Sequence, residues 1–325
     1  MELPQSLRTA MENILEIVSL SNLINDAQNI SKRYRAQREG LGPFITGKSE
    51  ALAYAASRMP ATYGAVLTAL ENSLSTAKCV PKTLVDAGAG TGAASWAADS
   101  VLDLDRITCI ERENLMQDIG MELMKHGSDA LRSAKWIRGD LVSDAIPGSD
   151  LVIAAYVLNE IAGIKRRDVI EKLWSAAGMM LLVVEPGTPA GYSNIMEARR
   201  ILADLGANIA SPCTHQNDCP KEGNDWCHFT CRINRSRLHK QLKGGEAPFE
   251  DEKFSYLCVV REKCNLQGMR VLRHPLVHSG FVQLEVCTSG GIKNIKLSKK
   301  DGEEYKSARK AASGTLLNAG ETVQP

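Results

Sequence analysis

The sequence predicts an α/β fold built on a mainly parallel, Rossmann-like sheet, with helices ahead of it and a cysteine-rich insertion near its end. Two observations carry this prediction. From residue 83 onward, short apolar runs alternate with helical runs, which is the pattern of a parallel sheet. The first apolar run ends in a glycine-rich turn and is followed at once by an alanine-rich helical run. Such a turn holds a nucleotide-like ligand at the carboxyl edge of a sheet.

The first 80 residues are predicted to be helical. Apolar residues recur at helical spacing within 5–38, and a second helical stretch begins near Ser49, breaks at Pro60 and resumes to about Ser75. Within it, the segment 54–63 places one arginine and two tyrosines around the proline. Two interpretations stay open for this segment, a kinked packing helix and a wall of the cofactor or substrate cleft.

The alternating region gives one strand for each apolar run and one helix for each intervening periodic run. The expected strands are 83–87, 106–110, 134–138, 150–156 and 179–185, and the expected helices are 92–102, 113–126, 158–177 and 190–204. Two further strands, around 250–260 and at 281–287, are expected to complete the same sheet with an antiparallel return.

The glycine turn reads Asp86-x-Gly88-x-Gly90-x-Gly92. Alternate glycines allow positive φ and let a ligand approach the backbone without meeting a Cβ. The pattern resembles the first motif of class I S-adenosylmethionine methyltransferases, in which the acidic residue faces the methionine end and the glycines line the adenosine. Gly88-x-Gly90-x-x-Ala93 also satisfies the NAD fingerprint, so NAD stays an alternative cofactor, as does a structural turn without a ligand.

Two acidic residues follow at the ends of the next strands. Glu111 lies 21 residues after Gly90, where an acidic side chain takes the ribose hydroxyls of a nucleotide. Asp140 ends the third strand, where methyltransferases place a contact to the adenine amino group. A surface glutamate and an ordinary Gly-Asp turn are the alternatives. The fourth strand carries neither a Pro-Pro-aromatic tetrad nor a cysteine nucleophile, so the catalytic residues and the acceptor atom stay unassigned.

Residues 213–231 hold four cysteines and two histidines among proline, glycine and asparagine. A bound metal centre can stabilise such a loop. The spacings of Cys213, Cys219 and Cys227 do not match the paired knuckles of a zinc ribbon and suit a larger, thiolate-bound centre such as an iron–sulfur cluster. The alternatives are zinc and free thiols. Candidates for a fourth ligand are Cys231, His215, His228 and the distant Cys287.

A run of basic residues follows directly. Between 228 and 243 there are five lysines and arginines and no acidic residue, spaced so that a helix would present them on one broad face. They are Arg232, Arg235, Arg237, Lys240 and Lys243. Such a face suits a phosphate backbone, and a solvated surface helix is the alternative. A second basic stretch runs from Lys293 to Lys300.

The compartment is predicted from what the sequence contains. Its N-terminal segment has no basic leader or apolar core of a signal peptide, and the apolar run 179–184 is far too short to span a bilayer. Nine cysteines, an odd number, indicate reduced thiols. We expect a bacterial-type cytoplasm or, in a eukaryote, the mitochondrial matrix, with no membrane or DNA partner.

Several segments together resemble the methyltransferase-like protein 17 family, which includes mitochondrial small-ribosomal-subunit assembly factors and their bacterial relatives. They are 58–63, 86–92, 226–229, 250–256 and 278–280 followed by Cys287. The resemblance runs from about residue 50 to 310. It implies a class I methyltransferase fold, association with the small ribosomal subunit, and a [4Fe-4S] cluster whose ligands match Cys213, Cys219, Cys227 and Cys287, leaving Cys231 outside the set.

The expected function follows from motif and resemblance together. We expect a protein that binds S-adenosylmethionine and an iron–sulfur cluster and acts on small-subunit ribosomal RNA, as an rRNA methyltransferase or as an assembly factor. The alternatives are a non-catalytic ribosome-binding factor with a vestigial pocket and an NAD-linked iron–sulfur oxidoreductase. The expected organisation is a helical region (1–80), a Rossmann-like S-adenosylmethionine-binding core (81–206), the cysteine-rich insertion with the basic helix (207–253), and the final strands of the sheet with a basic tail (254–325).

Overall fold

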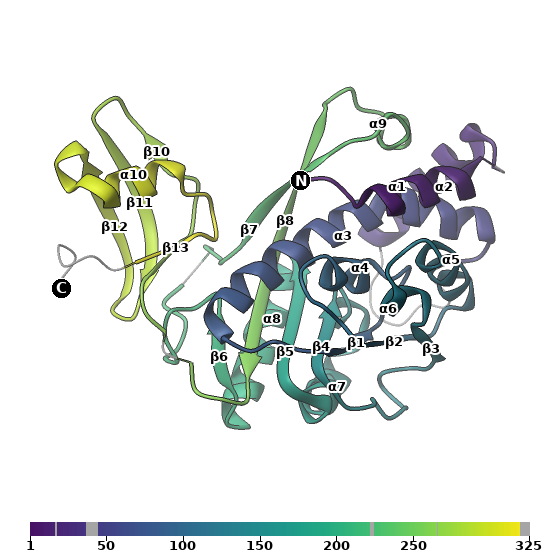
Figure 1. The fold of residues 1–325 in the computed structure, drawn as a ribbon, viewed down its shortest axis with the longest axis horizontal. Helices are drawn as coiled ribbons and strands as arrows, with labels where there is room; N and C mark the ends of the chain where they lie inside the picture. The colour runs from purple at the N-terminus through teal and green to yellow at the C-terminus, as the bar shows by residue number, and fades with distance from the viewer. Residues whose placement is uncertain (17, 37–44, 222–223, 265, 319–325) are drawn as a thin grey trace.

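The protein consists of a large α/β body and a smaller β-rich module beside it (Figure 1). The structure is a computed structural model that describes residues 1–16, 18–36, 45–221, 224–264 and 266–318. The large body holds an eight-stranded mixed sheet with helices on its faces, and the module holds a second sheet of five strands.

Three helices precede the sheet. They are α1 (Gln5–Leu15), α2 (Leu20–Ala36) and α3 (Lys48–Ala77). Contrary to the predicted break, α3 continues through Pro60 without interruption. An interior proline costs a helix about 3 kcal/mol, and here the tertiary packing of α3 offsets that cost, because most of its residues from Ala51 to Ser73 are buried.

Five parallel strands form one half of the large sheet, in the order β3-β2-β1-β4-β5. They are β1 (Thr83–Ala87), β2 (Arg106–Glu111), β3 (Lys135–Arg138), β4 (Ser149–Ala155) and β5 (Ala177–Pro186). The connecting helices are α4 (Ala93–Asp99), α5 (Asn114–Met124), α6 (Asp129–Arg132) and α7 (Gly163–Ala176), and α8 (Pro189–Asp204) follows β5. The helix expected from 158 begins at 163, because Leu158–Glu160 forms a separate 3-10 turn, η1.

Three antiparallel strands complete the sheet. The long strand β8 (Phe249–Val260) pairs with β5, and both β6 (Asn208–Ser211) and β7 (Phe229–Asn234) pair with β8. The predicted α/β class is therefore confirmed. The strand order of this mixed sheet switches between β1 and β4, and in open α/β sheets a crevice lies at the carboxyl ends of the strands at such a point.

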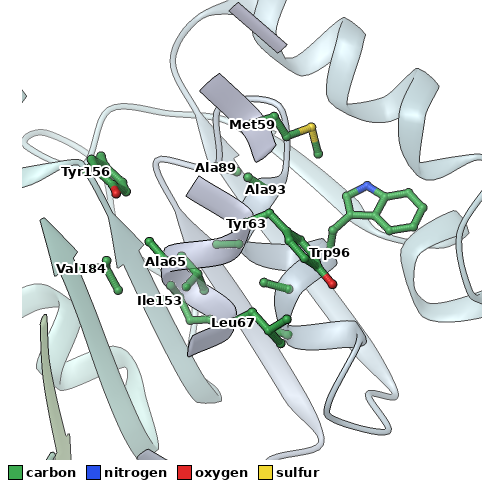
Figure 2. Packing of buried hydrophobic residues seen from close by; sticks show 14 of the residues in the cluster. Met59, Tyr63, Ala65, Leu67, Ala89, Ala93, Trp96, Ile153, Tyr156 and Val184 are labelled. Atoms are coloured by element: carbon green, nitrogen blue, oxygen red, sulfur yellow. The ribbon is translucent and has the colours of Figure 1, made fainter. Parts of the chain in front are cut away.

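The core of the large body lies between the sheet and helices α3 and α4. Figure 2 shows Met59, Tyr63 and Leu67 of α3 with Trp96 of α4 on one face of the sheet. Alanines dominate α3 and α4 at these contacts, so the helix backbones approach the strands closely. A second cluster fills the opposite face, under α7 and α8.

The strand expected at 281–287 does not belong to the large sheet, and that prediction is wrong. It forms β11 (Phe281–Thr288) in the module, with β9 (Met269–Val271), β10 (Leu276–Val277), β12 (Gly291–Ser298), η2 (Lys299–Asp301), α10 (Gly302–Lys310) and β13 (Leu316–Leu317). The reason is that β6 and β7 already occupy the outer edge of β8. Alternate apolar residues of β11 instead pack with α10 in a core of their own.

The predicted basic helix is also only partly a helix. Arg232 lies in strand β7, and the helix α9 spans Arg237–Lys243. None of the helices in the described ranges is long and apolar enough to cross a membrane.

Gly120 of α5 gives a test of the packing between α5 and β3. A Cβ at this position would lie 2.3 and 2.6 Å from two ring atoms of Trp136. Inserting a methyl group into a packed core forces neighbours out of place, so we expect Gly120→Ala to lower the free energy of unfolding by about 1–3 kcal/mol. Urea unfolding followed by circular dichroism measures this. Gly163→Ala, whose Cβ meets no atom nearer than 4.0 Å, is the matched control. An equal loss in both variants would contradict the packing.

Candidate cofactor cavity and cysteine site

The loop between β1 and α4 requires its glycines. Gly88, Gly90 and Gly92 all have positive φ, at 76°, 55° and 84°. A Cβ on Gly88 would lie 2.5 Å from Cγ2 of Val157, whereas Gly90 faces open space with only Met116 within 4 Å. The backbone N–H groups of Gly88 and Ala89 both donate to the carbonyl oxygen of Ile110, at 2.9 Å. The loop is thereby tied to the end of β2 and leaves a passage beside Gly90.

A cavity of about 310 Å³ opens beside this loop at the carboxyl edge of the parallel strands. Its size lies at the lower end of the range for small-molecule sites. Of the predicted cofactor residues, Gly88, Gly90, Glu111 and Asp140 line it. Asp86 and Gly92 do not line the cavity, since Gly92 faces Met124 and Trp136 on the other side of the loop.

Glu111 lies where the cavity meets the glycine loop. Its Oε2 accepts a hydrogen bond from the Gly90 N–H at 2.7 Å, and its Oε1 accepts one from the Glu113 N–H at 2.9 Å. Burial raises the pKa of Glu111, although these hydrogen bonds oppose that shift. Each carboxylate oxygen has a second lone pair, so the side chain can still accept from two hydroxyl groups of a ligand.

Asp86 has a structural place one layer beneath the cavity. It is 1% exposed, and its Oδ2 accepts hydrogen bonds from the N–H of Ser95 at 3.0 Å and from its Oγ at 2.7 Å. Burial raises the pKa of Asp86 to about 6. The carboxyl group thereby fixes the first turn of α4 against the end of β1, which holds the glycine loop in place.

Further residues line the cavity, and of these the sequence analysis had suggested only Tyr54, in the segment 54–63. They are Ile45, Tyr54, Tyr156, Val157, Glu160 and Lys165. Tyr156 directly follows β4 and has a φ of 62°, which is uncommon for a bulky residue. Its hydroxyl donates to Glu252 Oε1 at 2.9 Å, and Arg58 lies 3.7 Å from the same carboxylate. Of the two tyrosines around Pro60, Tyr54 lines the cavity.

Tyr63, the other tyrosine of that segment, lies away from it. Its hydroxyl lies 3.0 Å from Ser100 Oγ, on the α4 side.

Glu185, at the end of β5, fixes the turn that leads from β4 into α7. Its Oε1 accepts from the Leu158 N–H at 2.9 Å, and its Oε2 accepts from Asn194 Nδ2 at 3.1 Å. The side chain is fully buried, and burial raises the pKa of Glu185 to about 7.

The four cysteines assigned from the family resemblance converge on a second cavity. Cys213, Cys219, Cys227 and Cys287 all line it, although Cys287 belongs to the module and the other three to the insertion. Burial, and after it the proximity of the other thiols, raises the pKa of Cys227 well above its ordinary value and that of Cys287 to about 11. In the described part of the chain, no three His, Cys, Asp or Glu side chains form a group that could hold a metal ion.

The other candidate ligands lie differently. Cys231 is buried in β7 and faces α3, since its Sγ would lie 3.2 Å from a Cβ on Gly64. His228 does not line the second cavity. His215 is buried with its Nε2 3.6 Å from Cys287 Sγ.

Two buried arginines accompany the four thiols. Arg199 of α8 and Arg270 of β9 line the same cavity and are 3% and 1% exposed. Arg270 donates to the carbonyl oxygens of Pro212 and Gly314 at 2.9 and 2.8 Å, and Arg199 donates to the carbonyl oxygen of Asn217. Neither has a carboxylate within ion-pair distance among the described residues. Nothing in the sequence singled them out, because Arg199 lies in an ordinary helix and Arg270 in an ordinary strand.

The basic arm, defined as residues 232–243, is largely paired with acids of β8. Arg232 binds Asp251 through two hydrogen bonds of 2.7 and 2.8 Å. Arg235 and Lys243 both bind Glu250, at 3.2 and 2.9 Å.

The two remaining candidates of the arm, Arg237 and Lys240, have no carboxylate within ion-pair distance in the described ranges. The arm therefore offers two unpaired cations out of the five that the sequence suggested.

A family model described as "Mitochondrial small ribosomal subunit Rsm22" matches residues 48–318. The human "Ribosome assembly protein METTL17, mitochondrial" is 28% identical over 290 residues, covering 82% of this chain and 62% of the human protein. "Rsm22-cox11 tandem protein 2, mitochondrial" of Schizosaccharomyces pombe is 25% identical over 324 residues, covering 82% of this chain and 43% of that protein. The chain thus spans less than two thirds of the length of these relatives.

Solved structures give weaker similarities. A putative RNA methyltransferase from Pyrococcus horikoshii is 14% identical with a TM-score of 0.39, covering 72% of this chain and 95% of that one. Magnesium protoporphyrin IX methyltransferase from Synechocystis PCC 6803 is 17% identical with a TM-score of 0.40, covering 73% and 97%. Similarity at these values supports no argument about activity or ligand.

The buried carboxyl group of Glu185 predicts a pH dependence of stability. Its pKa is about 7 in the folded chain against an ordinary 4.5, so between these values the folded chain keeps a proton that the unfolded chain has lost. The free energy of unfolding therefore falls as the pH rises through this window and is constant above it. We expect Glu185→Gln to reduce the fall by up to about 3 kcal/mol, since one pKa unit corresponds to about 1.4 kcal/mol.

Urea unfolding at pH 5 and at pH 8 measures this difference. The glutamine keeps an acceptor oxygen for the Leu158 N–H, and Asp86 continues to titrate, so part of the dependence remains in the variant. Identical falls in the two proteins would show that Glu185 is not the group responsible.

Proposed function

The family match spans most of the chain, so this chain belongs to the mitochondrial small ribosomal subunit Rsm22 family, and on that premise we propose that it binds S-adenosylmethionine and acts on the small ribosomal subunit. The resemblance stated from its motifs is thereby confirmed. The observation that carries the cofactor part is the cavity at the carboxyl edge of β1, β2, β3 and β4, with the glycine loop and Glu111 in its wall.

The residues around the cavity fit S-adenosylmethionine. Gly90 leaves room for a ligand to approach the backbone, Glu111 can accept from both ribose hydroxyls, and Asp140 lies just after the third strand, where an adenine amino group can donate to it. When bound, the cofactor supplies an electrophilic methyl group on a sulfonium. The chain would contribute alignment of an acceptor with that methyl, an effect worth up to about 7–11 kcal/mol in the best cases.

The geometry near Tyr156 favours a role in assembly without methyl transfer as a second candidate. The Tyr156 hydroxyl donates its proton to Glu252, so it does not at the same time donate to a methyl acceptor. Burial and the Glu252 carboxylate raise the pKa of Tyr156 well above its ordinary value, so the phenol does not act as a base at neutral pH. In an assembly factor without methyl transfer, a ligand in the cofactor cavity would stabilise or regulate the fold that binds the small ribosomal subunit.

The partner and the compartment are proposed from the relatives. The human relative is named a mitochondrial ribosome assembly protein, and the family description names the mitochondrial small ribosomal subunit. We propose that the chain acts on an assembling small subunit through its ribosomal RNA. The corresponding compartment is the mitochondrial matrix in a eukaryote or the cytoplasm in a bacterium.

The second cavity is proposed to hold a [4Fe-4S] cluster on Cys213, Cys219, Cys227 and Cys287. Thiolates are the donors that iron–sulfur clusters use. The buried guanidinium groups of Arg199 and Arg270 support the proposal, because burying a charge is costly unless an opposite charge accompanies it. Four thiolates around a cluster carry that opposite charge. The cluster would join the insertion to β11 of the module and is assigned a structural role.

The cofactor proposal predicts a specific binding defect. Glu111→Gln removes the negative charge that strengthens hydrogen bonds from the ribose hydroxyls, so we expect S-adenosylmethionine affinity to fall about tenfold or more. Isothermal titration calorimetry measures it. Glu122→Gln, which alters an exposed residue of α5 that pairs with Lys125, is the control and should bind as the wild type does.

Titration with NAD should give no heat. Binding of NAD in place of S-adenosylmethionine would contradict the cofactor. Incubation of the protein with immature small subunits and methyl-labelled S-adenosylmethionine then separates an rRNA methyltransferase, which transfers label to RNA, from an assembly factor, which does not.

The cluster proposal predicts different outcomes for two buried cysteines. Protein purified without oxygen should be brown and contain iron and sulfide. Cys287→Ser removes a proposed ligand and should bleach it, whereas Cys231→Ser, which faces α3, should leave the iron content unchanged. Iron, sulfide and zinc are measured on both variants. Colourless wild-type protein with stoichiometric zinc would contradict the cluster.

A further inference from the structure

The module has the chain order of a known oligonucleotide-binding barrel. Strands β9 and β10 both pair with β11, and we count them as one interrupted first strand. After it come β11, β12, helix α10 and then β13, which pairs with β9. These are the first four strands of an OB-fold, with the helix after the third. In that fold, the face of the second and third strands and the first loop bind oligonucleotides. Here those parts are β11, β12 and the turn 278–280.

Positive charge is concentrated in this module. Between residues 269 and 317 there are nine lysines and arginines against four acids, whereas the rest of the chain has 30 against 34. The near-zero total charge therefore hides a basic module attached to a slightly acidic body. The summed charge therefore attracts a polyanion to the module more than to the body.

The two faces of the module sheet differ in character. Val282, Leu284 and Leu297 point to the inner face, where they pack with Tyr305 and Ala308 of α10. Residues directly opposite each other in an antiparallel pair share a face, and side chains alternate along a strand.

The outer face therefore carries Phe281, Gln283 and the residues in register with Gln283, which are Lys296 and Leu276. Leu276 is 62% exposed. Helix α10 packs on the inner layer (Figure 1), and Gln283 and Lys296 of the outer face are exposed.

The outer face presents an aromatic pair next to a cation. The rings of His278 and Phe281 stack with centroids 4.4 Å apart and planes at 21°. Lys296 Nζ lies 4.1 Å from the centroid of the Phe281 ring. The turn is closed by a hydrogen bond from the His278 N–H to the Phe281 carbonyl oxygen at 2.9 Å, which holds the pair in place. Aromatic rings offer a nucleic-acid base a surface to stack on, and a lysine beside them can bind the phosphate of the same nucleotide.

Acidic side chains do not neutralise the positive charge of Lys296 on this surface. Glu285, the acid of β11 on the same face, is bound to the buried Nζ of Lys221 at 2.6 Å. Lys296 has no carboxylate within ion-pair distance in the part of the chain that the structure describes. In the basic arm, by contrast, most of the positive charge is neutralised, because Asp251 and Glu250 bind three of its five cations.

We propose that the outer face of β11 and β12 binds a single-stranded segment of RNA, with a base stacked on the His278–Phe281 pair and a phosphate on Lys296. This inference rests on the proposed ribosomal partner and names the surface that recognises it. Cys287 lies at the other end of the strand that begins with Phe281, so a centre bound at Cys287 would fix the RNA-binding strand relative to the large body.

The test measures binding of a fluorescein-labelled oligouridylate to the full chain by fluorescence anisotropy over a range of salt concentrations. The double variant with His278→Ala and Phe281→Leu keeps an apolar side chain on the strand but removes both rings, and its affinity should fall about tenfold, the effect of losing one stacked base. Lys296→Gln should reduce the slope of log affinity against log salt by about 0.7, since one phosphate contact to a single strand is lost.

Lys306→Gln is the matched control. It removes the same charge from α10, on the opposite layer of the module, where Lys306 pairs with Glu303. Its affinity should stay within about twofold of the wild type. The thermal midpoint of each variant shows whether the module remains folded.

Co-sedimentation with small ribosomal subunits separates the possible failures. If the wild type sediments with subunits and the ring variant binds the oligonucleotide and the subunits as tightly, the proposed surface is wrong while the ribosomal partner stands. The same holds if binding is lost only in a variant with Arg237→Gln and Lys240→Gln. If the wild type binds neither subunits nor oligonucleotide, the proposed function fails together with the surface.

Discussion

Strand β8 is the constraint on which the rest of the structure depends. Its carboxyl-terminal half pairs with β5 and β6 inside the large sheet, and its amino-terminal half extends beyond β5 and pairs with β7. The outer edge of β8 is taken by β6 and β7, and the chain after β8 forms a separate module with a sheet of its own. The acids at its start, from Glu250 to Glu252, then face the basic arm and the cofactor cavity.

The same strand explains how charge is distributed over the molecule. Glu250 and Asp251 neutralise most of the basic arm, and Glu252 holds the Tyr156 hydroxyl and lies near Arg58. Ion pairs at a surface contribute little stability each, but they decide which cations remain available to a polyanion. Besides Arg237 and Lys240 of the arm, Lys296 of the module stays available, and an aromatic ring accompanies it.

The cysteine cavity shows how charge and burial support one another across distant parts of the chain. Arg270 is buried and donates to one carbonyl oxygen of the insertion and one of the module, and Arg199 reaches the insertion from α8. Burial raises the pKa of the Cys213 thiol, and the two buried cations oppose that shift, which favours the thiolate form that binds metals. Lys221 and Glu285 add an ion pair between insertion and module, so the contact between them depends on polar interactions that a bound centre would reinforce.

The sequence by itself determined the class of the fold, the order and approximate limits of β1 to β5, and the glycine loop, because these follow from local periodicity and from backbone conformations that only glycine adopts readily. It could not determine that α3 continues through Pro60, that Asp86 lies beneath the cavity, or that 281–288 belongs to a second sheet. Those outcomes depend on tertiary contacts between segments that lie far apart in the sequence. The tertiary structure alone decided that acids of β8 neutralise most of the basic arm and that Arg199 and Arg270 meet the four thiols, because pairing between residues far apart in the chain leaves no local pattern.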